Sequence, residues 1–268
     1  MPNPSIFTSI INSYLPEPHA SLLNGIIFGV SLHTSQEFYQ QIRIVGLLHI
    51  VVLSGTNITI LAAIIATLTK KFGKFISILL TILMIIIFII FVGPQAPIIR
   101  AGIMGILTLV AILYGRKSTA LYSLFLSLLM IIIFKFDWIS TISLQLSYGA
   151  TLGIILFGTT ITKPSTGFLT NFFNDFKKEI RLSLSAQIFT IPIIFLYFKQ
   201  ISLIGIISTA FVSPLITPLM IFGFATAVLG KIHFSLGLIP SYICYIMLDY
   251  MVKVIEILSK IPFGYFKF

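Results

Sequence analysis

The chain has 268 residues, of which 57% are hydrophobic and only 9% are charged, and its mean hydropathy is +1.09. Soluble globular domains carry roughly 25% charged residues, so this composition excludes that class and indicates an integral membrane protein. The apolar runs are continuous and lack the ~10-residue alternation of a transmembrane barrel, so we expect helices. The net charge of +10 fits either loop lysines that orient the protein or a polyanionic substrate.

Residues 1–43 are mixed in polarity, and we interpret them as an entry segment that does not cross the membrane. Within them, residues 20–32 form an apolar piece that is too short to span a bilayer. Such a piece is typical of an interfacial or re-entrant helix. The first residues lack a basic stretch followed by an uninterrupted apolar core, so we expect no cleavable signal peptide.

The first long apolar segment, at about 44–68, contains a polar cluster in its middle. The residues concerned are His49, Ser54, Gly55, Thr56 and Asn57. Polar side chains are unfavourable in hydrocarbon unless they face protein or a water-filled cavity, so we interpret this segment as a broken span that contributes groups to a conduit. Alternatively, Ser54 and Thr56 bond back to the preceding turn while Gly55 permits close helix packing.

Seven further apolar segments are long enough, or nearly long enough, to be spans. They lie at about 75–92, 97–114, 119–134, 141–158, 181–198, 201–229 and 236–258. The segment 201–229 contains Pro214 and Pro218, so it is kinked or split into re-entrant halves, and the expected total is about seven to eight spans. Residues 163–180 place phenylalanines at helical spacing beside polar residues, which predicts an amphipathic helix in the interface plane.

The predicted fold class is therefore all-α, a polytopic helical bundle with broken or re-entrant helices and one interfacial amphipathic helix. We expect a single domain over 1–268, with a first helical group at 44–158 and a second at 181–268. If the spans alternate, the basic loops gather mainly on one face, which should be cytoplasmic and places the N-terminus outside.

Two further sites carry polar groups inside apolar segments. Arg100 lies just inside the segment that opens at Pro97. It either extends to the nearby interface or points inward as a fixed positive charge suited to phosphate groups. Gln145 and Ser147 lie near the start of a later apolar segment, where Gln145 either bonds across helices or lines a path.

The sequence offers little for catalysis. No cluster of histidines and acids has metal-ligand spacing, so we expect no metal site, and no phosphate-binding glycine loop is present. His49 and Ser54 lie five residues apart without a third partner, which is weak evidence for a hydrolase site. Cys244 is the only cysteine, which excludes an intrachain disulfide. We therefore expect neither enzymatic activity nor a cofactor.

Taken in order, these motifs resemble the transmembrane (competence) domain of the ComEC-type family of DNA-uptake channels. The run from Gly46 to Asn57 is similar to the family pattern G-L-x-H-L-L-A-[IV]-S-G-L-H. The later motifs that follow in the family's order are Gly93-Pro94, Arg100-Ala101, Gly115-Arg116, Gln145-Leu146-Ser147-Tyr148 and the region from Ser208 to Leu215 with Pro214. Asn57 stands where the family usually has a second histidine, and Thr209 stands where it usually has asparagine.

The resemblance implies a multi-pass protein of the cytoplasmic membrane that passes single-stranded DNA during natural transformation. The motif residues from His49 to Asn57, together with Arg100, Gln145 and Ser147, would then line or shape the path. Gly93, Pro94, Arg116 and Pro214 would have structural roles. We expect single-stranded DNA and membrane lipid as partners, with a separate nuclease and a cytoplasmic motor, and a homo-oligomer is compatible with the pattern. The soluble N-terminal domain and the metallo-β-lactamase-like C-terminal domain of typical members are not expected within this chain.

Two other functions remain open: a small-solute or ion transporter built around the same broken helix, and an assembly subunit without a conduit. A proton- or sodium-coupled carrier usually needs a carboxylate buried in the membrane. The segments from 44 to 158 contain only Asp137, which lies at a loop. This observation favours the channel.

Overall fold

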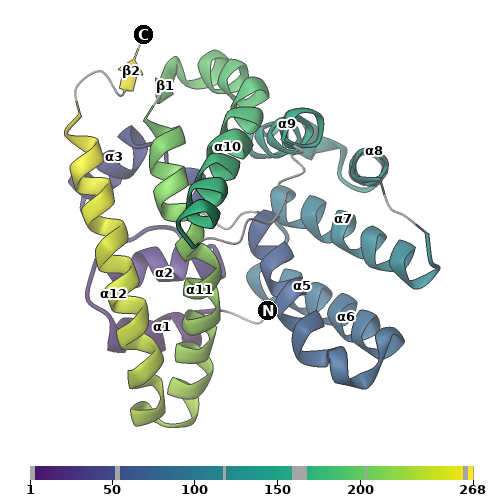
Figure 1. Cartoon of the computed structure of the whole chain (residues 1–268), viewed down its shortest axis with the longest axis horizontal. Coiled ribbons are helices and arrows are strands. Elements are labelled where there is room, and N and C mark those ends of the chain that lie inside the picture. The colour runs from purple at the N-terminus through teal and green to yellow at the C-terminus, as the bar shows by residue number, and fades with distance from the viewer. Residues whose placement is uncertain are drawn as a thin grey trace.

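The computed structural model describes residues 4–51, 55–116, 119–158, 168–202, 204–261 and 265–267. These residues are almost entirely helical (Figure 1). The elements are α1 (Ser5–Tyr14), α2 (His19–Phe28), α3 (Gln36–Ile44), α4 (Leu48–Val51), α5 (Gly55–Thr69), a 3-10 helix (Lys70–Phe72), α6 (Lys74–Val92), α7 (Ala96–Leu113), α8 (Ala120–Phe134), a second 3-10 helix (Phe136–Ser140), α9 (Ile142–Phe157), α10 (Phe168–Phe198), β1 (Gln200–Ser202), α11 (Gly205–Ile232), α12 (Phe234–Ser259) and β2 (Tyr265–Lys267).

Five described helices are long and apolar enough to cross a membrane, which identifies a multi-pass helical membrane protein. They are Lys74–Val92, Ala96–Leu113, Phe176–Tyr197, Gly205–Ile232 and Phe234–Ser259. The apolar helices α8 and α9 coincide with two more of the segments that we predicted as spans. They have 15 and 16 residues. At 1.5 Å per residue such helices reach only roughly 22–24 Å, less than the ~30 Å of a typical hydrocarbon core.

One half of the molecule is built on the antiparallel pair α11 and α12, which packs against the N-terminal helices (Figure 1). Helix α2 lies inside this half, in contact with α1, α11 and α12, and all ten of its residues are buried. Two of its polar side chains are hydrogen-bonded within this half, Ser21 to the carbonyl oxygen of His33 and Asn24 to Asn12. Close approach of α11 requires Gly223, because a side chain there would collide with Ile27 of α2. The short apolar helix predicted at residues 20–32 thus ends at Phe28 and leaves no face exposed.

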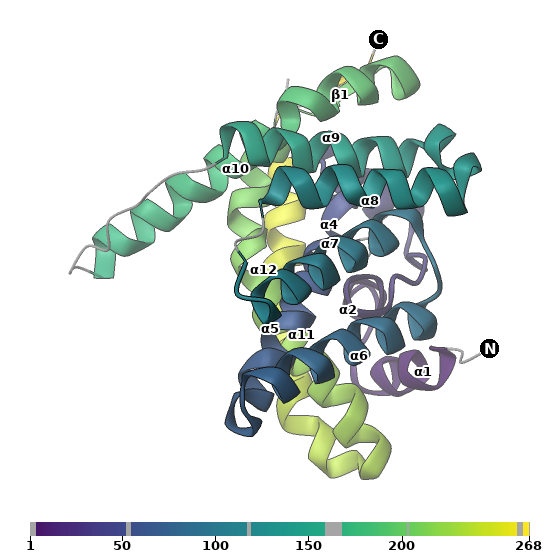
Figure 2. The same cartoon turned by 90° about the vertical axis from the view of Figure 1, so that its right-hand side faces the viewer.

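The other half contains α5, α6 and α7, which share an apolar cluster formed by Ile58, Leu61, Ile85, Phe88 and Ile98. Helices α8 and α9 continue from α7, and in Figure 2 they lie side by side above it. Helix α9 also packs along α10, and α10 contacts α11, so the two halves meet through α10 and through the contact between α5 and α11.

Two boundaries differ from our predictions. Helix α10 is continuous over 31 residues, so the amphipathic segment at 163–180 and the apolar segment that follows form one helix, whereas residues 163–167 lie outside the described part. The polar residues at the junction lie within the helix, where Glu179 accepts a hydrogen bond from Ser213 of α11 at 2.8 Å.

Helix α11 is continuous through Pro214 and Pro218, so it is not split into two half-helices. A proline removes one helical hydrogen bond, but contacts with neighbouring helices can compensate for that loss. Helix α11 packs against α12, α10, α1 and α2. At the far end of the chain, β2 pairs antiparallel with β1, which brings the C-terminus next to the α10–α11 junction.

Candidate functional site

Arg100 lies in the second turn of α7 and points into the protein, with only 7% of its surface exposed. Its Nη1 donates a hydrogen bond to Thr151 Oγ1 on α9 and lies 3.8 Å from the sulfur of Met104. The hydroxyl of Thr151 in turn donates to the carbonyl oxygen of Ser147 at 2.8 Å. Of the two alternatives for Arg100, the structure therefore shows the inward-facing one.

The guanidinium also lies over an aromatic ring. Its Cζ is 6.0 Å from the ring centroid of Tyr148, a distance at which a cation and a ring attract each other. The hydroxyl of Tyr148 is 2.8 Å from Ser127 Oγ, and Ser127 donates to the carbonyl oxygen of Leu124 at 2.7 Å. A chain of polar contacts thus runs from α7 through α9 to α8.

Arg100 also meets the start of α5. A Cβ atom placed on Gly55 would lie 2.5 Å from Arg100 Nη2, so a larger residue there would displace the guanidinium from its present position. The structure therefore brings together Gly55 and Arg100, which belong to two different motifs of the sequence. Thr56 is exposed at this end of α5. Ser54 lies outside the described residues, as does the side chain of His49, although its backbone belongs to α4.

Asn57 is buried and joins α5 to α2. Its Nδ2 donates to the carbonyl oxygen of Ile26 at 2.6 Å. Ile26 is among the last four residues of α2, whose carbonyl groups have no partner within the helix. The Asn57 side chain thus satisfies one end carbonyl of α2 and holds that helix against α5.

The electrostatic character of this site is positive. Within the described ranges, Arg100 forms no ion pair, and its Nε is buried without a hydrogen-bond partner. A buried charge without a counter-ion is unfavourable, because desolvation is not repaid by attraction to an opposite charge. A guanidinium offers planar donors that match the oxygens of a phosphate or carboxylate group. The Arg100 site, as we call Arg100 with Gly55, Tyr148 and Thr151, is therefore suited to an anionic group.

A family model described as Competence protein matches residues 26–268, which is most of the chain. The chain belongs to the competence protein family. No curated protein and no solved structure matches it. Membership supports a general role in competence and DNA uptake, and together with the five candidate spans it indicates a multi-pass membrane protein.

The remaining residues that we predicted in the conduit of this competence-family protein lie at different places. Gln145 Nε2 donates to the carbonyl oxygen of Ile139 at 3.2 Å, and the same side chain lines an apolar cavity of about 870 Å³ between α8 and α9. No hydrogen bond in the described part of the chain joins it to Arg100. Ser147 contributes its carbonyl oxygen to Thr151, and its own side chain is half-buried.

The four positions with predicted structural roles lie at turns or on the surface. Gly93 ends α6 with a φ of 101°, a conformation that favours glycine, and exposed Pro94 follows it. Arg116 is exposed just beyond α7, and Pro214 is exposed within α11. Among the described residues no group of three or more histidines, cysteines and acids could hold a metal ion.

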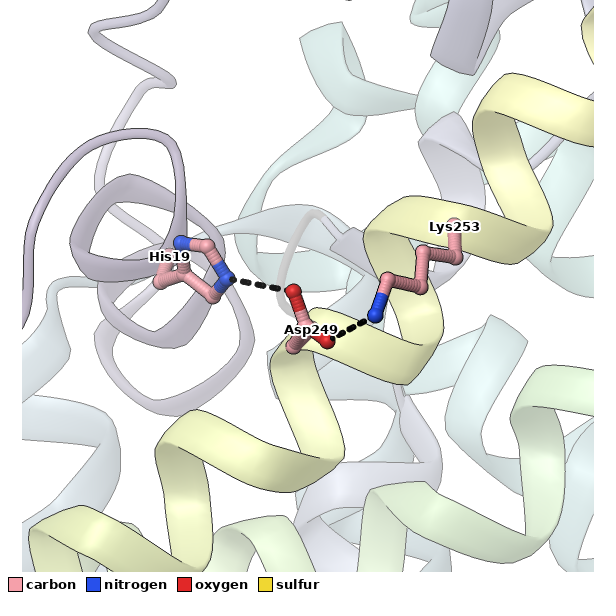
Figure 3. A network of polar contacts seen from close by, with 3 residues as sticks. All are labelled: His19, Asp249 and Lys253. Atoms are coloured by element: carbon pink, nitrogen blue, oxygen red, sulfur yellow. Dashed lines mark ion pairs between the residues drawn. The ribbon is translucent and has the colours of Figure 1, made fainter.

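Sequence reasoning missed Thr151 and Ser127 as members of the polar network. Both repeat an earlier hydroxyl residue at a spacing of four, Ser147 with Thr151 and Ser123 with Ser127. This spacing places two hydroxyls on one face of an apolar helix and could have indicated a polar helix contact. The sequence contains no comparable signal for the second polar cluster, in which His19 and Asp249 meet from opposite ends of the chain (Figure 3).

Proposed function

We propose that this protein forms part of a conduit that carries single-stranded DNA across the cytoplasmic membrane. The observation that carries the proposal is the buried Arg100, which has no acidic partner among the described residues. A passing phosphate group supplies the missing counter-ion, and the family match supports DNA as the polyanion. The site then favours entry of the strand backbone without reading its sequence.

The residues around Arg100 are also consistent with a site for a phosphate group. Gly55 leaves the Nη2 side of the guanidinium free of side-chain bulk, and Thr151 fixes the opposite nitrogen. Tyr148 is held by Ser127 and presents its ring to the guanidinium. Fixed donors lose little conformational freedom when a phosphate binds, so the site is suited to brief contacts along a moving strand.

In this proposal the protein is a passive conduit with no catalytic step. Directed transport then needs a motor on the cytoplasmic side, and conversion of duplex DNA to a single strand needs a separate nuclease. A second copy of the chain could complete the wall of the path, because α10 has only 6% of its candidate span buried.

The alternative of a small-solute or ion transporter has less support in the first helical group. Asp137, the carboxylate between residues 44 and 158, is exposed in a 3-10 helix. It therefore does not form the buried acidic site that a coupled carrier usually needs.

The test is complementation of a deletion strain in a transformable host, with uptake of labelled DNA as the readout. We expect Arg100→Ala to reduce uptake by roughly tenfold or more, because loss of one charged contact corresponds to at least about 1.5 kcal/mol. Arg100→Lys should restore uptake only in part, since lysine lacks the planar donor arrangement. Arg181→Ala is the matched control, because Arg181 is exposed on α10, and it should transform normally.

Membrane insertion of each variant is checked by its abundance in the membrane fraction. Normal DNA uptake in the deletion strain would contradict the proposed function. If the deletion strain loses uptake but the Arg100→Ala variant restores it fully, the proposed conduit stands and the proposed role of Arg100 is wrong.

A further inference from the structure

A second polar cluster lies between α2 and α12, away from the Arg100 site, and consists of His19, Asp249 and Lys253 (Figure 3). His19 is the first residue of α2 and is 7% exposed. Its Nε2 lies 4.0 Å from Asp249 Oδ1. The other oxygen of Asp249, Oδ2, is 2.7 Å from Lys253 Nζ. One carboxylate thus stands between an imidazole and an ammonium group.

The imidazole of His19 is incompletely satisfied. Both ring nitrogens are buried, and neither has a hydrogen-bond partner among the described residues. The 4.0 Å distance to Asp249 is longer than a hydrogen bond. The ring stacks on Tyr245, with centroids 4.8 Å apart and an interplanar angle of 21°, so one of its faces is covered while its edge points to the carboxylate. An unpartnered buried polar group is unfavourable and calls for a specific explanation.

We propose that His19 is a proton-binding site, with Asp249 as its counter-ion and Lys253 as the competitor for that counter-ion. When His19 binds a proton, the Asp249 carboxylate moves from Lys253 toward the imidazolium. When the proton leaves, the carboxylate returns to Lys253. This site does not depend on the DNA conduit.

Three other ionisable groups near α2 are engaged elsewhere, whereas His33 contacts the helix through its backbone carbonyl, which accepts a hydrogen bond from Ser21. Glu17 is the nearest, and its Oε2 accepts the backbone N–H of Ser21 at 3.2 Å, so it serves the start of the helix. Tyr14 of α1 donates to the carbonyl oxygen of Phe234, and Lys231 of α11 lies over the ring of Phe7. The groups on α12 that face His19 are Tyr245, Asp249 and, through Asp249, Lys253.

The balance of these effects sets the pH at which the proton binds. Burial lowers the pKa of His19, while the charges of Asp249 and, less strongly, Glu17 raise it. The net direction is downward, so the folded protein holds His19 neutral where a histidine in water is already partly charged. The stability contributed by neutral His19 is present above the ordinary histidine pKa and is lost as the pH falls through the lowered one.

Proton binding at this position acts on a helix of one half that is hydrogen-bonded to α5 of the other half. Helix α2 has ten residues, with His19 at its first position and the Asn57-bonded Ile26 near its last. A change in the pairing of Asp249 therefore alters the contact of α12 with the same helix that anchors α5. The proposed ligand is the proton, and the proposed response is a shift of the α2–α12 contact.

The experiment is a pH titration of the full chain in lipid nanodiscs, with carbon-13-labelled histidine side chains observed by NMR. The chain has four histidines, and His19→Gln assigns the signal of interest by its disappearance. We expect Asp249→Asn to lower the pKa of His19, since it removes the opposite charge beside the imidazole. Lys253→Met should raise the pKa of His19, because it frees the carboxylate for the imidazolium.

Lys260→Met is the matched control, because Lys260 is exposed at the end of α12 and should leave the His19 titration unchanged. The signals of the other histidines serve as internal references in every spectrum. Lys253 has 67% of its side chain exposed, so its replacement leaves the core intact and is decisive even where Asp249→Asn impairs folding. A His19 signal that does not titrate between about pH 4 and 8 would overturn the proposal. Unchanged titration in Lys253→Met, or shifts of the same sign in the two variants, would also overturn it.

Discussion

The two halves of this molecule use burial differently. In α11 and α12, 39% of the candidate span is buried within the chain, compared with 22% in α7 and 6% in α10. The half around α2 has a large apolar core, and its buried histidine, His19, lies beside a carboxylate of α12. The half around α7 has a smaller apolar cluster, and its buried Arg100 has no acidic partner among the described residues. This difference indicates that the first half provides rigidity, whereas the second is arranged around a charge.

The largest expected effect tests the rigidity of the first half. Leu22 of α2 is completely buried, whereas Leu121 of α8 is 50% exposed. We expect Leu22→Ala to destabilise the protein by about 2–5 kcal/mol, because it leaves a cavity in a packed core. The same change at Leu121 should cost within about 0.5 kcal/mol. Thermal unfolding in detergent measures both, and equal losses would show that the two halves are packed alike.

The next prediction concerns the charge in the second half. Replacing a buried charge that has no counter-ion by an apolar side chain of similar length removes the desolvation cost. We therefore expect Arg100→Met to leave the protein equally stable or to stabilise it by about 1–4 kcal/mol, while DNA uptake falls. A pronounced loss of stability would show that Arg100 serves the fold and would remove the contrast between the halves.

The smallest effect is expected at the connection between the halves. Asn57→Ala leaves the carbonyl oxygen of Ile26 buried without its donor, which should cost about 1–3 kcal/mol. Hydrogen exchange should increase at the end of α2 and at the start of α5 but not in α12. An increase spread evenly over the chain would show that Asn57 contributes only to general packing.

Much of the fold could be predicted because local signals mark the helix ends. The segments expected at 75–92 and 97–114 differ by one residue from α6 and α7, since the Gly93-Pro94 pair separates them. We predicted an amphipathic helix at 163–180 and a separate apolar segment after it, because the composition changes near residue 181, whereas the structure has one helix over Phe168–Phe198. A change from polar to apolar residues does not itself end a helix, and residues 177–181 contain neither glycine nor proline.

The candidate site could be predicted only in part, because its contacts join residues that are distant in sequence. The motif order identified Arg100 and Gly55, but the direction of the Arg100 side chain depends on Thr151, a residue 51 positions away. The pairing of His19 with Asp249 depends on how α2 enters the core, which no local pattern specifies. For Gln145 we weighed a hydrogen bond across helices against a place along a path, and the structure gives it a hydrogen bond to the carbonyl oxygen of Ile139 in the preceding 3-10 helix.

The hydrogen bond between Asn57 and Ile26 gives a physical meaning to the departure from the family pattern. In the pattern that the run from Gly46 to Asn57 resembles, position 57 holds histidine, and an imidazole N–H can donate to a carbonyl oxygen as an amide N–H does. What this position requires is a hydrogen-bond donor of suitable reach, and a titratable ring is dispensable there. An amide has no charge to gain, so Asn57 presents the same donor to α2 at every pH, whereas a histidine at this position would become charged as the pH falls. The replacement thus exchanges a pH-responsive group for a constant one and leaves the architecture unchanged.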